Sequence, residues 1–106
     1  MSTSDYAEAD MTLLVLTLSP ALEEEIIDYL LGQNSVVSFT SQQVNGHGDH
    51  GALSVAEQVS GRRKRVQYQV VLPQREIAAL LAGLAASVGK DIEYWEQPIR
   101  GYGHIR

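Results

Sequence analysis

The sequence contains no cysteine among its 106 residues, which excludes disulfide bonds, thiolate metal sites and cysteine nucleophiles. It also lacks any apolar run near the ~20 residues that a helix needs to cross a bilayer. The N-terminal segment has neither the positive region nor the apolar region of a signal peptide. We therefore expect a cytoplasmic protein that does not insert directly into a membrane.

Positive charge is scarce and unevenly placed. Eight Lys and Arg stand against thirteen Asp and Glu, and the net charge of −5 argues against nucleic acid as a partner. Half of the basic residues lie together at Arg62, Arg63, Lys64 and Arg65. Such a cluster would concentrate an anion at one place. The apolar fraction of 44% and the charged fraction of 20% are typical of one ordinary globular domain.

The first half of the chain predicts a strand, a helix and a second strand. Residues 11–18 are apolar at both alternating sets of positions, which is typical of a strand buried on both faces. A second copy of the chain could cover the face that the helices leave open. Ser19 and Pro20 fit the start of a helix, and Gly32 fits its end. A second strand is expected over 35–44. The apolar stripe expected on the helix consists of Leu22, Ile26, Ile27, Leu30 and Leu31.

The second half predicts a strand, a helix and a last strand. Residues 65–72 alternate, so that Val66 and Tyr68 face inward while Arg65 faces outward with Gln67 and Gln69. A helix that ends at Gly89 follows, and a strand over 91–97 places one of Tyr94 and Trp95 in the core. Residues 1–10 are expected to be a disordered acidic tail and 45–61 a flexible loop within the single domain 11–106. The helix carries its apolar residues at helical spacing: Ile77, Leu80, Leu81, Leu84 and Val88.

The order β-α-β-β-α-β is that of the ferredoxin-like sandwich. This α+β fold has a four-stranded antiparallel sheet with two helices on one face.

Two groups of residues could bind a ligand. The basic cluster could hold a phosphate or a carboxylate, since Arg offers a planar fork to such groups, or it could simply be a solvated loop end. His47, Asp49 and His50 have the side chains of a divalent-metal site, with His104 or a neighbouring subunit completing it. An exposed polar loop tip would explain the same residues. No nucleophile elbow or phosphate-binding loop is present, and we expect no enzyme.

Several segments of the chain form a pattern. They are V-N-G-H-G at the start of the loop, E-Q-V-S-G-R-R-K-R-V-Q-Y-Q-V-V-L-P on its return, G-K before the last strand, and I-E-Y-W within it. A tail rich in Gly and Arg follows. Together these segments resemble the PII-like signalling superfamily. Residues 11–106 look most like a small uncharacterised PII-like family of bacterial proteins.

The resemblance implies a homotrimer that binds a small anionic ligand, often an adenine nucleotide, in clefts between subunits. It also implies that loop 45–61 docks on a partner such as a membrane transporter or an enzyme. By position, the ligand residues would be Gly46 and Gly48 at the loop base, Lys90 after Gly89, and the tail residues Arg100, Gly101 and Gly103. Relatives with this fold are linked to divalent-metal tolerance, which keeps a metal site at His47, His50 and His104 as the alternative.

The sequence differs from the PII pattern in three places. The turn S-V-G-K-D lacks the longer double-glycine phosphate loop, no tyrosine lies between Val44 and Arg65, and the tail is not an arginine-threonine-glycine segment. The identity of the anion, nucleotide or metal therefore stays open.

Overall fold

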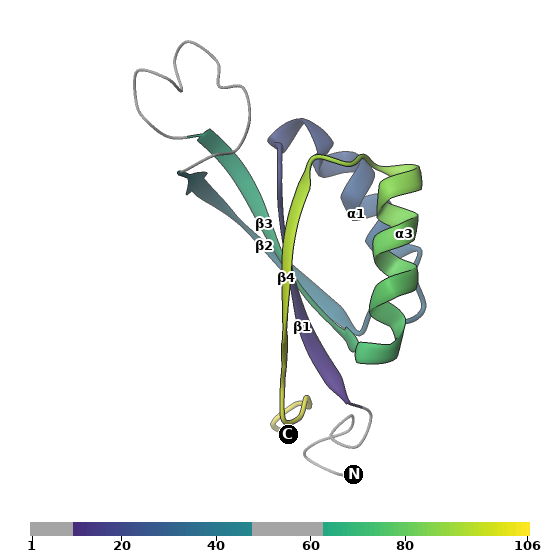
Figure 1. Ribbon diagram of the computed structural model, residues 1–106. Helices are drawn as coiled ribbons and strands as arrows, with labels where there is room; N and C mark the ends of the chain where they lie inside the picture. Colours follow the sequence, from purple (N-terminus) through teal and green to yellow (C-terminus); the bar gives the residue numbers. More distant parts are fainter. Residues whose placement is uncertain (1–9, 48–62) are drawn as a thin grey trace.

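A computed structural model gives the structure of residues 10–47 and 63–106 (Figure 1). Predictions for residues 1–9 and for Gly48, Asp49, His50 and Arg62 lie outside these residues. The first part contains strand β1 (Met11–Leu18), the short 3-10 helix η1 (Pro20–Leu22), helix α1 (Glu23–Leu31) and strand β2 (Ser38–Gly46). The second contains β3 (Arg63–Pro73), the 3-10 helix η2 (Gln74–Glu76), helix α3 (Ile77–Ser87) and β4 (Ile92–Pro98).

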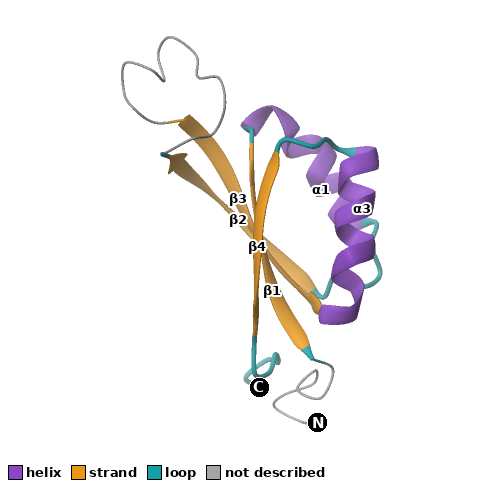
Figure 2. Ribbon diagram, in the orientation of Figure 1, coloured by secondary structure: helices purple, strands orange, loops and turns teal. Residues whose placement is uncertain are grey.

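The four strands form one antiparallel sheet in the order β2-β3-β1-β4. Figure 2 shows both helices on the same face of that sheet. The predicted ferredoxin-like fold is therefore confirmed. No helix within residues 10–47 and 63–106 is both long and apolar enough to cross a membrane.

The core lies between the sheet and the two helices. Alternate residues of β1 and β3 point toward the helices, and Leu14, Leu16 and Tyr68 are all fully buried. Ile26 and Leu30 of α1 cover them, together with Ile77, Leu80 and Leu84 of α3. Full burial of one such aliphatic side chain stabilises the fold by about 1.5–3 kcal/mol. Burial also raises the pKa of the Tyr68 phenol, and nearby Glu23 raises it further.

The two helices approach each other closely at Gly83. A Cβ atom at that position would overlap the Tyr29 hydroxyl and stand 2.7 Å from Tyr29 Cζ. The same hydroxyl donates a hydrogen bond of 3.2 Å to the Leu80 carbonyl oxygen. Burial raises the pKa of Tyr29. Glycine at position 83 thus lets a tyrosine lie between the helices.

The start of the first helix follows the prediction. The Ser19 hydroxyl accepts a hydrogen bond from the Ala21 backbone N–H, and Pro20 begins η1. The chain then continues as α1, which carries three glutamates in its first turn, where the helix dipole favours negative charge. The prediction that Leu31 belongs to the buried stripe is wrong, because Leu31 is 71% exposed. It lies about 140° round the helix from the fully buried Ile26.

The prediction that Tyr94 or Trp95 enters the core is also wrong, since these side chains are 51% and 44% exposed. β4 is an edge strand, and only its first residue, Ile92, packs partly against the core. On the helix-free face, Val15 lies in register between Gln69 and Trp95 and is only 4% exposed. The burial of Val15 therefore needs no second copy of the chain, whereas the exposed Trp95 leaves apolar surface open.

Candidate functional site

The β2–β3 hairpin extends beyond the end of β1. The last pair that β1 makes with β3 is Leu18 with Val66, yet β3 continues outward through Arg65 to Arg63. Opposite them, β2 continues to Gly46, two residues beyond the expected end of the strand at Val44. The basic cluster, as far as it is described, is therefore part of a strand and not a loose loop end. Strand geometry fixes where each of its side chains points.

Strand alternation sends the basic side chains to opposite faces of the sheet. Lys64 pairs with Asn45, and both lie on the face that carries the helices, in line with Val66. Arg63 and Arg65 lie on the helix-free face, opposite Gly46 and Val44. The three side chains therefore do not all point toward one ligand on one face of the sheet.

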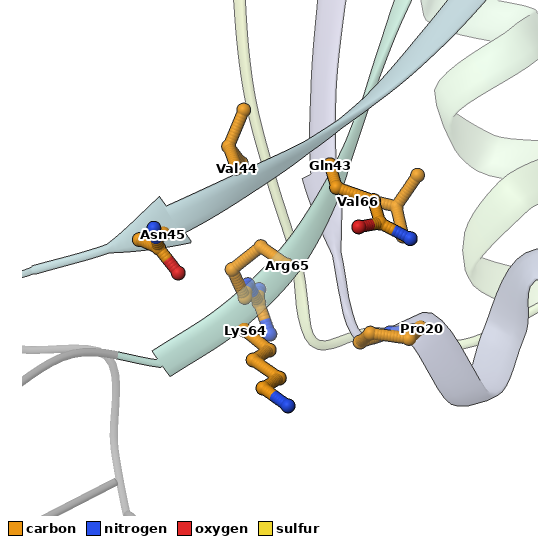
Figure 3. A pocket seen from close by; sticks show the side chains of 7 residues that line it. All are labelled: Pro20, Gln43, Val44, Asn45, Lys64, Arg65 and Val66. Atoms are coloured by element: carbon orange, nitrogen blue, oxygen red, sulfur yellow. The ribbon is translucent and has the colours of Figure 1, made fainter. Parts of the chain in front are cut away.

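A pocket of about 430 Å³ opens between the hairpin base and the start of η1. Figure 3 shows Lys64 and Asn45 on the hairpin side of this pocket, with Pro20 across from them. Its lining combines amides and positive charge with short apolar surfaces, and its volume falls within the usual range of small-molecule sites. The lining residues are Pro20, Gln43, Val44, Asn45, Lys64, Arg65 and Val66.

Arg65 is a buried cation that ties β3 to β1. Its side chain is only 3% exposed, and Nη2 donates a hydrogen bond of 3.3 Å to the Thr17 carbonyl oxygen. A buried guanidinium needs such partners because desolvation of the charge is costly. Arg65 therefore holds the hairpin base in position, besides contributing to the pocket wall.

Arg63 reaches across the end of β1 to the turn before β4. Its Nη2 atom lies 3.0 Å from Oδ2 of Asp91, which directly follows Lys90. The Asp91 side chain is 71% exposed, so the ion pair contributes little to stability. It does show that two predicted ligand segments, the loop base and the turn at Gly89 and Lys90, meet at one end of the sheet.

The predicted ligand residues of the tail lie at the other end of the sheet. The Ile99 backbone N–H donates to the Met11 carbonyl oxygen (3.0 Å), and the Tyr102 hydroxyl donates to Ser38 Oγ (3.1 Å). Ser38 begins β2 whereas Gly46 ends it, a separation of about 26 Å along the strand. One chain therefore does not bring Arg100, Gly101 and Gly103 together with Arg63 and Lys90.

The histidines are separated in the same way. His47 directly follows the end of β2, whereas the His104 ring packs edge-on against Tyr102 near the start of β2, with the ring centres 5.8 Å apart. Within the described parts of the chain, no three His, Asp or Glu side chains are arranged to hold a metal ion. His47 and His104 could share a metal only if they came from different copies.

Sequence reasoning missed four contributors to this region. The sequence predicts Pro20 only as part of a helix start and Asp91 only as part of a strand. Gln43 and Asn45 face the helices beside Val66 and Lys64, a placement that depends on the register of β2 against β3. The sequence offers one signal for this region, the alternation of residues 65–72. Extended back to Lys64, this alternation predicts that Lys64 lies on the helix side of the sheet.

Comparisons with known proteins bear on the fold and on the family of the chain. A search of curated proteins finds no match. A crystal structure of a DUF3240 family protein from Shewanella baltica OS155 superposes with a TM-score of 0.75 at 24% identity, covering 100% of both chains. B. subtilis GlnK superposes with a TM-score of 0.61 at 18% identity over 85% of each chain, which supports the predicted PII-like fold. The family model described as a protein of unknown function, DUF3240, matches residues 8–106. The chain therefore belongs to the DUF3240 family, a small family with a PII-like fold.

Proposed function

We propose that the chain is a non-enzymatic, PII-like regulatory protein of the cytoplasm that binds a small anionic ligand at the hairpin base. The observation that carries this proposal is the meeting of Arg63 with the turn at Lys90 and Asp91, joined by the 3.0 Å ion pair. These segments are far apart in sequence, and together they place two cations at one end of the sheet. Cations held on strands and tight turns are pre-organised to receive an anion.

The ligand site is completed by a second copy of the chain. The tail with Arg100, Gly101 and Gly103 is held at the opposite end of its own sheet by Tyr102 and Ser38. In a homotrimer, the tail of one subunit can stand against the hairpin base of its neighbour. The exposed Trp95 on the helix-free face supports such an assembly, because association would remove its apolar surface from water.

The ligand we propose first is an adenine nucleotide. Lys90 would bind its phosphates, as the PII resemblance implies, and Arg63 would join it, as the charge of the basic cluster predicts. The pocket beside Lys64 lies on the other face of the hairpin base from Arg63, so its carboxamides, from Gln43 and Asn45, would hydrogen-bond a base only if the ligand reached past the end of the strands. Binding at the hairpin base would alter loop 45–61, and through it the docking of the chain on a protein partner such as a membrane transporter or an enzyme.

Isothermal titration with ATP, ADP and AMP tests the ligand, with light scattering to give the oligomeric state. We expect binding that weakens about 10–100-fold in Arg63→Gln and in Lys90→Gln, since each variant loses a hydrogen bond to a charged group. Arg75→Gln is the matched control, because Arg75 is an exposed arginine of η2 at the far end of the sheet. A trimer that binds none of the three nucleotides would exclude this ligand class.

A further inference from the structure

A second, smaller pocket lies between α3 and the edge strand β4. It measures about 180 Å³ and is lined mainly by apolar side chains, with Leu81 and Ala85 on the helix and Ile92 and Tyr94 on the strand. This volume is below the range usual for small-molecule sites, but it can hold one aliphatic side chain. The α3–β4 groove, as we call it, exists because α3 covers only the beginning of the edge strand.

The tail carries an apolar side chain with nothing packed against it. Ile105 is 103% exposed, the highest value among the exposed large apolar residues of the described segments. It cannot rest in its own groove while Tyr102 is bonded to Ser38, because Ser38 lies on β2 and the groove lies on β4, at opposite edges of the sheet. The same chain thus contains an unfilled apolar groove and a fully exposed apolar side chain.

The charges around the two features are complementary. Three acidic residues, Asp91, Glu93 and Glu96, lie on β4 or directly before it, whereas the tail carries Arg100 and Arg106 and no acidic residue. Opposite charges steer association and fix its register more than they add to affinity.

We infer that the α3–β4 groove receives Ile105 from the tail of a second copy of the chain. The inference rests on the homo-oligomer in the proposed function and adds a contact between subunits to it. The apolar side chain fills the groove beside Tyr94, while the arginines of the tail approach the acidic residues of β4. The groove also contains Lys90, so the docked tail lies next to the turn that we propose as part of the ligand site.

Cysteine crosslinking tests this contact directly, because the chain has no cysteine of its own. Chains with Ile105→Cys are mixed with tagged chains carrying Ala85→Cys, allowed to exchange subunits, and oxidised. We expect a disulfide-linked pair of chains on a non-reducing gel, formed several-fold faster than with Ala86→Cys. Ala86 is the matched control because it is also exposed and lies about 100° further round α3.

Two results would overturn the inference. One is equal crosslinking of Ile105→Cys with Ala85→Cys and with Ala86→Cys. The other is a crosslink within single chains of the Ile105→Cys/Ala85→Cys double variant, which would show that each tail fills its own groove. If an oligomer of unchanged mass gave either result, only the contact would be overturned and the proposed function would stand. A monomeric wild-type chain would overturn the proposed assembly as well.

A second measurement does not depend on thiol chemistry. Ile105→Asp should weaken subunit association tenfold or more in analytical ultracentrifugation, since burial of an isoleucine contributes about 1.5 kcal/mol or more. Leu31→Asp is the control, because Leu31 is an exposed aliphatic residue on α1, away from the groove. Equal dissociation constants for Ile105→Asp and Leu31→Asp would count against the contact.

Discussion

Different kinds of interaction stabilise the two ends of the sheet. At the hairpin base, the links are charged: Arg65 bonds the Thr17 carbonyl and Arg63 pairs with Asp91. At the tail end, they are uncharged hydrogen bonds, from Ile99 to Met11 and from Tyr102 to Ser38. Charged links respond to salt and to bound anions, whereas uncharged ones do so much less. The charged end is therefore suited to sensing a ligand, and the uncharged end to presenting the tail at a fixed place.

The largest effect should come from the buried cation. Arg65→Met should lower the free energy of unfolding by about 2 kcal/mol, because it removes a charge-assisted hydrogen bond from a buried position. Urea denaturation gives this value. Arg75→Met, an exposed arginine near the tail end, should change it by less than about 0.5 kcal/mol. Equal losses in both variants would mean that Arg65 does not anchor the hairpin base.

A smaller effect is expected at the tail end. Tyr102→Phe removes only the hydroxyl that donates to Ser38, and should cost about 1 kcal/mol with little dependence on salt. Hydrogen exchange of residues 99–104 should become faster in this variant. Ser38→Ala removes the other partner of the same bond, so the two changes should not add in the double variant. Full additivity would show that the hydrogen bond contributes nothing.

The smallest effect on stability is expected for the exposed ion pair. Asp91→Asn should change the free energy of unfolding by at most about 1 kcal/mol, and the change should shrink as NaCl is raised, because salt screens exposed charges. Urea denaturation at low and high salt measures it. Glu25→Gln, on the exposed surface of α1, is the control for loss of one negative charge. A salt-independent loss in Asp91→Asn would contradict the distinction between the two ends.

The order of elements could be predicted from the sequence because hydrophobic periodicity is local. The strand at 11–18 and the helix start at Ser19 and Pro20 follow from residues next to one another in the chain. Interactions across the sheet could not be predicted in the same way. The continuation of β2 to Gly46 depends on pairing with Arg63, and the contact of Arg63 with Asp91 joins residues 28 apart in sequence.

Errors about single side chains have a related cause. Tyr94 and Trp95 have the composition of a core strand, yet their exposure follows from the position of β4 at the edge of the sheet. Leu31 has the right spacing from Ile27 but lies on the side of α1 away from the sheet. In both cases the residue type and spacing are local, whereas burial depends on which element lies opposite.

The two edges of the sheet also differ in a way that bears on aggregation. β2 carries no charged residue between Ser38 and Gly46, whereas β4 carries Glu93 and Glu96 and ends at Pro98. Charges and proline on an edge strand hinder the addition of further strands, and like charges opposite each other destabilise a pair. Two β4 edges would therefore repel each other, while β2 presents no such barrier. Addition of a strand from another copy is therefore least hindered at β2, which makes β2 the edge where aggregation between copies would begin.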